Sequence, residues 1–202
     1  MPLLKGNLHA HTTFSDGRRP IAEVIARYRD LGYGFLAITD HEDRVHDDYW
    51  FEIPAGDDRM LILPGIELNY RPLSQHVGKV TGDRETLYVL NHPARYGLTV
   101  AETLRRARVI TRAGLPIHAV EITDTGVYQP EYDVDEITLP KIATDDSHRD
   151  PHFGRAWIEV EAATRSMDAI IRAVRAGDFG VGFAPGAPDA DGRRFDLFDY
   201  GE

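Results

Sequence analysis

Short, mainly apolar runs that end in histidine or carboxylate residues recur along this 202-residue chain. Residues 35–39 lead into Asp40 and His41, and residues 60–66 lead into Glu67. Runs of this length and composition are typical of strands that are buried on both faces. An α/β fold gathers the carboxyl ends of its parallel strands on one face, so residues far apart in sequence meet there. The sequence therefore predicts one pocket rich in imidazole and carboxylate groups.

Six of the nine histidines belong to such motifs. Two of the motifs, His9-Ala-His11 and Asp146-Ser-His148, place polar groups two residues apart. In an extended backbone alternate residues share a face, so both side chains of each motif point the same way. Imidazole and carboxylate without thiolate are ligands that suit Zn²⁺, Mn²⁺ or Fe²⁺. On the motifs alone, the candidate ligands are His9, His11, Asp16, Asp40, His41, Glu67, His76, His92, Asp146 and His148.

Each motif also has an ordinary structural interpretation. Asp16 precedes Gly17, and an Asp-Gly pair is typical of a turn. Asp40 is equally well explained as a cap of the next element, and His76 alone as a hydrogen-bonded polar histidine. Glu67 is more informative, because a carboxylate directly after a buried strand needs a hydrogen-bond donor, water or a cation. The occurrence of all these groups at strand ends favours the metal site.

The remaining histidines and the His-Pro pair complete the polar pattern. His92 precedes Pro93, and a residue before proline is expected to be extended, which stiffens a loop and suits a ligand. His46, His118 and His152 lie outside the motifs. We do not expect these three histidines to contact the site.

Helices and strands are expected to alternate along the chain. Amphipathic spacing predicts helices over residues 20–31, 99–113 and 167–176. Apolar runs predict strands over residues 35–39, 60–66, 87–90, 117–123, 141–144 and 156–160. This alternation is typical of an α/β fold with a mostly parallel sheet. Residues 42–59 are polar and aromatic without a clear period, and we interpret them as an excursion over the site.

Length and charge limit the number of domains and the kinds of partner. The chain is long enough for one well-buried core, so we expect a single domain over residues 1–202 with an irregular tail at 184–202. A net charge of −10 opposes stable binding to nucleic acid or to anionic membranes. The absence of cysteine excludes disulfides, thiolate zinc sites and a cysteine nucleophile. No signal peptide or membrane span is evident, which favours the cytoplasm.

The motifs resemble those of the PHP superfamily, the polymerase and histidinol phosphatase domain. Four blocks are similar to the family signature: His9-Ala-His11 with Ser15-Asp16-Gly17, Thr39-Asp40-His41, Gly65-Ile66-Glu67 and Asp146-Ser147-His148. Asn91-His92-Pro93 is similar to the His-Pro block of the family. Residues 5–183 most resemble the CehA/McbA branch of metallohydrolases.

This resemblance implies a distorted (β/α)7 barrel of the PHP type that holds two or three divalent metal ions. One ion would take His9, His11, Glu67 and Asp146. A second would take Asp16 and His41 and would share Glu67 as a bridge. A third would take His76, His92 and His148. Asp40 would orient a ligand rather than act as one.

The resemblance also implies a metal-dependent hydrolase. Our hypothesis is a phosphoesterase that hydrolyses a small phosphate mono- or diester through a metal-bridging hydroxide, with Asp40 and Glu67 in catalytic roles. Three cationic side chains close in sequence to the ligands are candidate phosphate contacts: Arg71, Lys79 and Arg95. The alternatives are a carboxyl or carbamate ester hydrolase on the same site, and a non-catalytic metal-binding module.

Overall fold

The computed structural model describes residues 3–162 and 164–185. The first elements are β1 (Leu3–Asn7), α1 (Ile21–Asp30), β2 (Phe35–Ile38), α2 (Tyr49–Glu52), β3 (Leu61–Tyr70) and β4 (Gln75–Thr81). There follow β5 (Thr86–Leu90), α3 (Val100–Arg112), β6 (Ala119–Glu121), β7 (Thr123–Asp124) and β8 (Val127–Tyr128). The last are β9 (Lys141–Ile142), β10 (Ala156–Glu161), α4 (Met167–Ala176) and β11 (Gly180–Phe183).

Nine strands form one curved sheet in the order β11-β10-β1-β2-β3-β4-β5-β6-β9, and β7 pairs with β8. Just beyond β1 and β9, Ala10 pairs in parallel with Ser147. The His11 N–H donates to the Ser147 carbonyl at 3.0 Å. This bridge joins the first strand to the last parallel strand, so the sheet is nearly closed. The predicted α/β barrel is therefore confirmed.

The sheet is mixed, whereas a mostly parallel one was expected. Four of its eight pairings are antiparallel. Two of these four involve β4, which the sequence pattern did not predict, and the other two involve β10. A short 3₁₀ turn at Arg71–Leu73, followed by Ser74 with φ 46°, reverses the chain and lays β4 against β3. Polar residues and Gly78 interrupt the apolar pattern of β4, which explains why it was missed.

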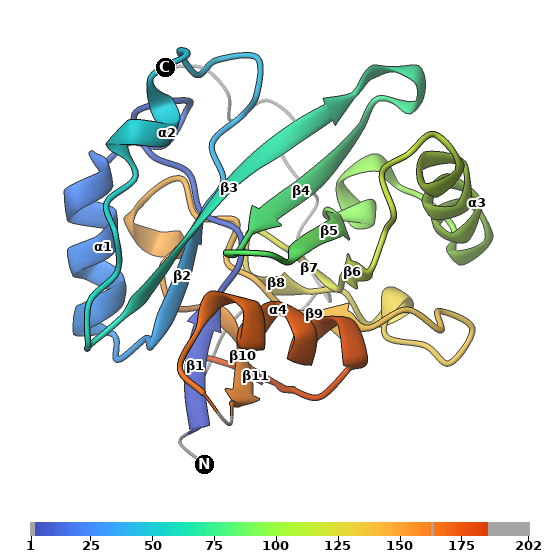
Figure 1. Ribbon diagram of the computed structural model, residues 1–202. Helices are drawn as coiled ribbons and strands as arrows, with labels where there is room; N and C mark the ends of the chain where they lie inside the picture. Colours follow the sequence, from blue (N-terminus) through green and yellow to red (C-terminus); the bar gives the residue numbers. More distant parts are fainter. Residues whose placement is uncertain (1–2, 163, 186–202) are drawn as a thin grey trace.

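The helices cover both faces of the curved sheet (Figure 1). On the outer face, α1 packs Val24 and Tyr28 against β2 and β3, and α3 packs Ile110 against the side formed by β4 to β6. On the inner face, Ile171 and Val174 of α4 join side chains from β1 to β6, β9 and β10 in one cluster. Burial of each such aliphatic side chain contributes about 1.5–3 kcal/mol, so α4 closes one end of the barrel firmly.

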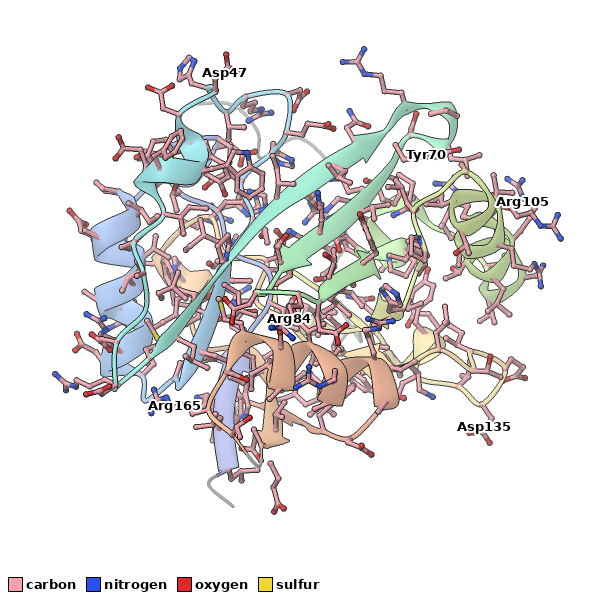
Figure 2. All side chains as sticks on the ribbon, in the orientation of Figure 1. Asp47, Tyr70, Arg84, Arg105, Asp135 and Arg165 are labelled. Carbon is pink, nitrogen blue, oxygen red and sulfur yellow. The ribbon has the colours of Figure 1, made fainter. Side chains whose placement is uncertain are left out.

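The predicted helices agree closely with α1, α3 and α4. Figure 2 shows Arg105 pointing outward from α3, as expected for an amphipathic helix. Residues 42–59 contain one short helix, α2, and the expected irregular tail lies outside the described residues from residue 186 onward. No helix in the described part of the chain is long and apolar enough to cross a bilayer.

Candidate metal centre

The candidate ligands gather at the end of the barrel opposite α4. The inner faces of β3, β4 and β6 are marked by Leu63, Val80 and Ala119. Glu67, His76 and Glu121 lie an even number of residues from these positions, so they share the inner face. The other candidates follow strand ends: His9 and His11 after β1, His41 after β2, His92 after β5, and Asp146 and His148 after β9.

Glu67 lies at the middle of the centre and is fully buried. Its Oε1 is 3.3 Å from His9 Nε2, 3.2 Å from His76 Nδ1 and 3.0 Å from His92 Nε2. The Asn91 amide donates to the same oxygen at 2.8 Å. One carboxylate oxygen therefore faces three imidazoles that come from three different strand ends.

The second Glu67 oxygen faces two more histidines. Oε2 is 3.4 Å from His11 Nε2 and 3.0 Å from His41 Nδ1. A main-chain hydrogen bond holds Glu67 beside the strand end that carries His41, because the Glu67 N–H donates to the Asp40 carbonyl at 3.0 Å. Glu67 is thus in contact with five imidazole rings, which makes it the only described carboxylate positioned to serve several ions at once.

Asp146 completes the buried side of the centre. Its Oδ1 is 3.2 Å from both His9 Nε2 and His11 Nε2, and these two ring nitrogens are 3.0 Å apart. The other oxygen, Oδ2, accepts a hydrogen bond from Arg95. Asp146 has φ 43°, in the left-handed region that Asp tolerates better than most residues with a side chain.

The centre opens to solvent at Asp16, at His148 and at His76, whose side chain is the most exposed of the three at 23%. Asp16 Oδ2 is 3.3 Å from His41 Nε2, and Oδ1 is 3.3 Å from His148 Nε2. The side chains of Asp16 and His148 are each 13% exposed, whereas those of His11 and Glu67 are fully buried. Arg44 lies at this opening and pairs with Asp16 Oδ2 at 2.9 Å.

The residues fit divalent cations, as their unsatisfied atoms indicate. Six buried atoms of the candidate ligands make no hydrogen bond: Asp16 Oδ2, Glu67 Oε2, His76 Nδ1, His92 Nδ1, Asp146 Oδ1 and His148 Nε2. Several of these lie within ion-pair distance of a neighbour without hydrogen-bond geometry. A buried polar atom left unpaired costs about 1–3 kcal/mol. Cations coordinated by these atoms would remove that cost.

Ligand atoms within 4.8 Å of one another form four overlapping groups. The groups are His11-Asp16-His41-His148, His9-Glu67-His92, His9-His11-Asp146 and His41-Glu67-His76. His148 thus lies with Asp16 and His41, whereas the resemblance placed it with His76 and His92. The reason is local, because His148 Nδ1 bonds to the Asp146 carbonyl at 2.9 Å and its own carbonyl accepts from Arg18 N–H at 2.8 Å. Both bonds hold the ring over the loop that carries Asp16.

Comparison with known proteins agrees with this geometry. Residues 134–179 match the PHP_C family, described as PHP-associated, and this segment includes the Asp146-Ser-His148 motif. A two-domain protein from Bacteroides vulgatus ATCC 8482, which contains a predicted PHP-like metal-dependent phosphoesterase, has the same fold. Its TM-score is 0.67 at 20% identity, over 90% of this chain and 65% of that one. This chain therefore has a PHP-like barrel fold and carries a PHP-associated segment at residues 134–179.

Two further solved structures share this barrel fold. An amidohydrolase from Chromobacterium violaceum, with bound sulfate and no metal, has a TM-score of 0.58 at 13% identity, over 90% of this chain and 99% of that one. The lesion-specific endonuclease PfuEndoQ from Pyrococcus furiosus has a TM-score of 0.57 at 12% identity, over 89% and 58%. This chain thus spans less than two thirds of the Bacteroides and Pyrococcus proteins. No curated protein matches its sequence.

The electrostatics of the candidate metal centre keep its carboxylates ionised. Burial opposes the charge of Glu67 and Asp146, but His9 and the other cationic neighbours outweigh it and hold both pKa values well below the usual range. Burial also opposes the charge of His41, yet Asp16 and Glu67 raise its pKa to about 10. Because an imidazole must lose its proton to bind a metal, ions and protons compete for this site.

Asp40 supports the loop that carries two of the candidate ligands. Its carboxylate accepts hydrogen bonds from the Thr12 N–H at 2.7 Å, the Thr12 hydroxyl at 2.8 Å and the Ser15 hydroxyl at 2.6 Å. These donors belong to the loop between His11 and Asp16. Asp40 therefore fixes the conformation of the loop that presents two of the candidate ligands.

The three candidate phosphate contacts lie in different surroundings. Arg95 reaches the centre, where its guanidinium donates to Asp146 and, at 2.7 Å, to Asp124. Lys79 has the opposite parity to His76 in β4, so it faces the outer side of the sheet. Arg71 is exposed in the turn between β3 and β4. The structure thus brings only Arg95 of these three to the ligands.

The histidines left out of the motifs lie mostly where expected. His46 is exposed, and His118 accepts the Tyr88 N–H at 3.0 Å on the outer side of β6. His152 comes closer, because its Nδ1 accepts the His148 N–H at 3.3 Å. Burial and nearby Arg155 lower the pKa of His152 to about 4, so it is neutral and supports the backbone of His148.

Two features of the candidate metal centre escaped the sequence pattern. The prediction of an extended His92 is wrong, because its φ is 28° and its ψ is 64°. Glu121 explains this backbone, since its carboxylate accepts the His92 N–H at 2.8 Å. Glu121 itself was assigned no role. The available signal was a single carboxylate inside a buried apolar strand, which demands a partner.

Proposed function

We propose that this chain is a metal-dependent hydrolase that acts as a phosphoesterase on a small phosphate mono- or diester. The observation that carries the proposal is the buried convergence of five imidazoles on Glu67. Such a cluster is costly without cations, whereas a core packed for stability alone would satisfy its polar atoms internally.

The donor set fits two or three ions of Zn²⁺, Mn²⁺ or Fe²⁺. His9, His11, Asp146 and Glu67 would hold one ion, and Glu67 with His76 and His92 a second. Asp16, His41 and His148 would hold a third. When bound, such ions lower the pKa of a coordinated water toward neutrality and offset charge on a phosphoryl group.

The chain's own residues set where a substrate can enter. The centre reaches solvent at Asp16, His148 and His76, and the Arg44 side chain beside Asp16 is 48% exposed. A guanidinium pairs well with phosphate oxygens, because its N–H groups match their spacing. Arg44 would therefore hold the phosphate at the opening, while Arg95 would keep Asp146 in place.

The known structures support phosphate as the substrate group. The Bacteroides protein contains a predicted PHP-like phosphoesterase, and the Chromobacterium protein binds sulfate, which resembles phosphate in shape and charge. The Pyrococcus protein is an endonuclease, but the net charge of −10 on this chain opposes stable contact with nucleic acid. A small phosphate ester is the substrate that reconciles these observations.

Hydrolysis of a substrate panel by metal-loaded protein tests this proposal. The panel contains an aryl phosphate monoester, an aryl phosphodiester and an aryl carboxyl ester. In the phosphate reactions, a P–O bond forms from water and the P–O bond to the phenol breaks, with the proton of water passing to the released phenolate. We expect turnover of a phosphate ester, and its loss in a His11→Ala variant that still folds.

Other outcomes are equally informative. Turnover of the carboxyl ester alone would overturn the phosphoesterase proposal in favour of the carboxyl or carbamate ester hydrolase that resemblance to the CehA/McbA branch suggested. Metal-loaded protein that is inactive on every ester would favour the non-catalytic metal-binding module. The panel thus separates the three interpretations with one set of assays.

A further inference from the structure

Glu121 connects three parts of the chain beneath the metal centre. It is the last residue of β6 and is 1% exposed. Its Oε1 lies 2.8 Å from His9 Nδ1 and accepts the Thr144 hydroxyl at 2.6 Å. Its Oε2 accepts the His92 N–H at 2.8 Å. The three partners follow β1, β9 and β5, so one carboxylate ties together three strand ends.

The contact with His9 fixes which ring nitrogen carries the proton. A carboxylate accepts hydrogen bonds, so His9 Nδ1 must donate to Glu121. His9 Nε2, which lies 3.3 Å from Glu67 and 3.2 Å from Asp146, is then the nitrogen left to bind an ion after it loses its own proton. Metal-binding histidines generally have such a partner on the nitrogen that does not bind the ion.

The contact with His92 fixes a strained backbone. A non-glycine residue with φ 28° costs roughly 1–3 kcal/mol and persists only where its surroundings hold it. The hydrogen bond from the His92 N–H to Glu121 supplies such a restraint. This backbone directs His92 Nε2 to within 3.0 Å of Glu67. Glu121 thus acts on two histidines that belong to different parts of the centre.

We propose that Glu121 is a positioning residue of the metal centre: it holds His9 with Nδ1 protonated and holds His92 in its strained backbone. This inference rests on the metal centre of the proposed function but not on the identity of the substrate. Glu121 contacts neither the ions nor the substrate in this role. It determines the affinity of the centre for metal through the two histidines.

The number of hydrogen-bond donors around Glu121 allows a test of the proposal with a Glu121→Gln variant. Three donors meet the two oxygens of Glu121, and the amide of a Glu121→Gln variant has one oxygen and one NH₂ group. If the amide oxygen faces His9, the amide NH₂ group faces the His92 N–H, and two donors then meet without an acceptor. If it faces His92, His9 can pair only by moving its proton to Nε2, which removes a ligand lone pair. Both arrangements weaken the centre without changing side-chain size.

The measurement is metal affinity, by competition of Zn²⁺ or Mn²⁺ between protein and a chelator, with no substrate present. We expect Glu121→Gln to bind about 10–100-fold more weakly than the unmodified protein, as is usual for such supporting groups. The matched control is Asp168→Asn, which alters another carboxylate that accepts main-chain N–H groups, far from the ligands. It should bind metal normally. Unchanged affinity in folded Glu121→Gln would overturn the proposal.

A second measurement needs no variant at position 121. In zinc-loaded protein labelled with ¹⁵N-histidine, we expect the His9 ring to carry its proton on Nδ1, with the signal assigned by its loss in His9→Gln. A His9 proton on Nε2 would refute the proposal even if Glu121→Gln failed to fold. Since neither measurement involves turnover, an inactive substrate panel would leave this inference standing. Conversely, a wrong inference about Glu121 would not change which esters the protein hydrolyses.

Discussion

Replacing a candidate ligand should lower metal binding, whereas replacing a histidine outside the centre should not. His11→Ala and Asp146→Ala should each lower bound metal and activity by orders of magnitude, because each removes a ligand atom from the buried side. His118→Ala should do neither, since its ring lies on the outer side of β6. Mass spectrometry measures the bound metal of each variant, and an activity assay measures its turnover. Equal losses in all three variants would contradict the ligand assignment.

Arg44 offers a test of phosphate binding that leaves the ligands untouched. We expect Arg44→Gln to raise KM for a phosphate ester about tenfold, since a charged hydrogen bond contributes about 1.5–3 kcal/mol. Bound metal should not fall, because the variant removes a cation that competes with metal for Asp16 Oδ2. Arg71→Gln is the matched control and should leave KM unchanged. A fall in metal content in Arg44→Gln would assign Arg44 to the centre itself.

The candidate ligands were predictable from the sequence because each stands in a short motif after an apolar run. Glu121 was not, because one carboxylate in a strand says nothing about its partners, which lie 112 positions away for His9. Arg44 was missed for a similar reason. Its contact with Asp16 depends on how residues 42–48 fold back, and no periodic pattern specifies that path.

The loop between His11 and Asp16 is followed by Gly17, where the structure has no room for a larger residue. A Cβ on Gly17 would lie 2.6 Å from main-chain atoms of His11 and Thr12, and backbone cannot move aside cheaply. Gly17→Ala should therefore displace the loop at a cost of about 1–3 kcal/mol. Urea unfolding should show reduced stability, and chelator competition should show weaker metal binding. Wild-type values for both would refute this steric argument.

The stability that Asp168 gives to the start of α4 should depend on pH. Asp168 accepts the N–H groups of Arg84 and Glu85, and these bonds hold its pKa below the usual 3.8. The unfolded chain therefore binds this proton more readily, so the stabilisation is complete above about pH 4 and is lost as pH falls through the lower folded value. Asp168→Asn should lose less stability than wild type between pH 5 and pH 3 in urea unfolding. An identical loss would exclude this role for Asp168.

Elements with strong periodicity were predictable, and those fixed by distant contacts were not. The amphipathic helices α1, α3 and α4 agree with the sequence pattern to within about two residues. Strand β4 has an ambiguous pattern and exists because a tight turn returns the chain along β3. The backbone of His92 departs from the preference of a residue before proline because a hydrogen bond to Glu121 overrides that preference.

For the whole molecule, ions should stabilise the fold as well as catalyse. The ligands come from both ends of the sequence, so an ion that binds only the folded barrel shifts the unfolding equilibrium. At a concentration 100 times the dissociation constant, we expect about 2.7 kcal/mol of added stability. Calorimetry of metal-free and zinc-loaded protein measures this through Tm. His118→Ala should show the same shift, and Asp146→Ala should show little.

The barrel class was predictable from alternating elements, but its closure was not. Sequence periodicity says which residues are buried, whereas closure depends on Ala10 meeting Ser147 at a single bridge. The mixed pairing within the sheet likewise follows from turns rather than from composition.

That single bridge has a consequence for how the protein matures in the cell. His9 and His11 leave the ribosome early, and Asp146 and His148 follow roughly 7–30 s later at translation rates of about 5–20 residues per second. Until then the first histidines belong to an incomplete chain that cannot enclose an ion. Metal selection therefore falls to the finished barrel, so its ion should reflect the metals available after synthesis rather than those first encountered by the emerging chain.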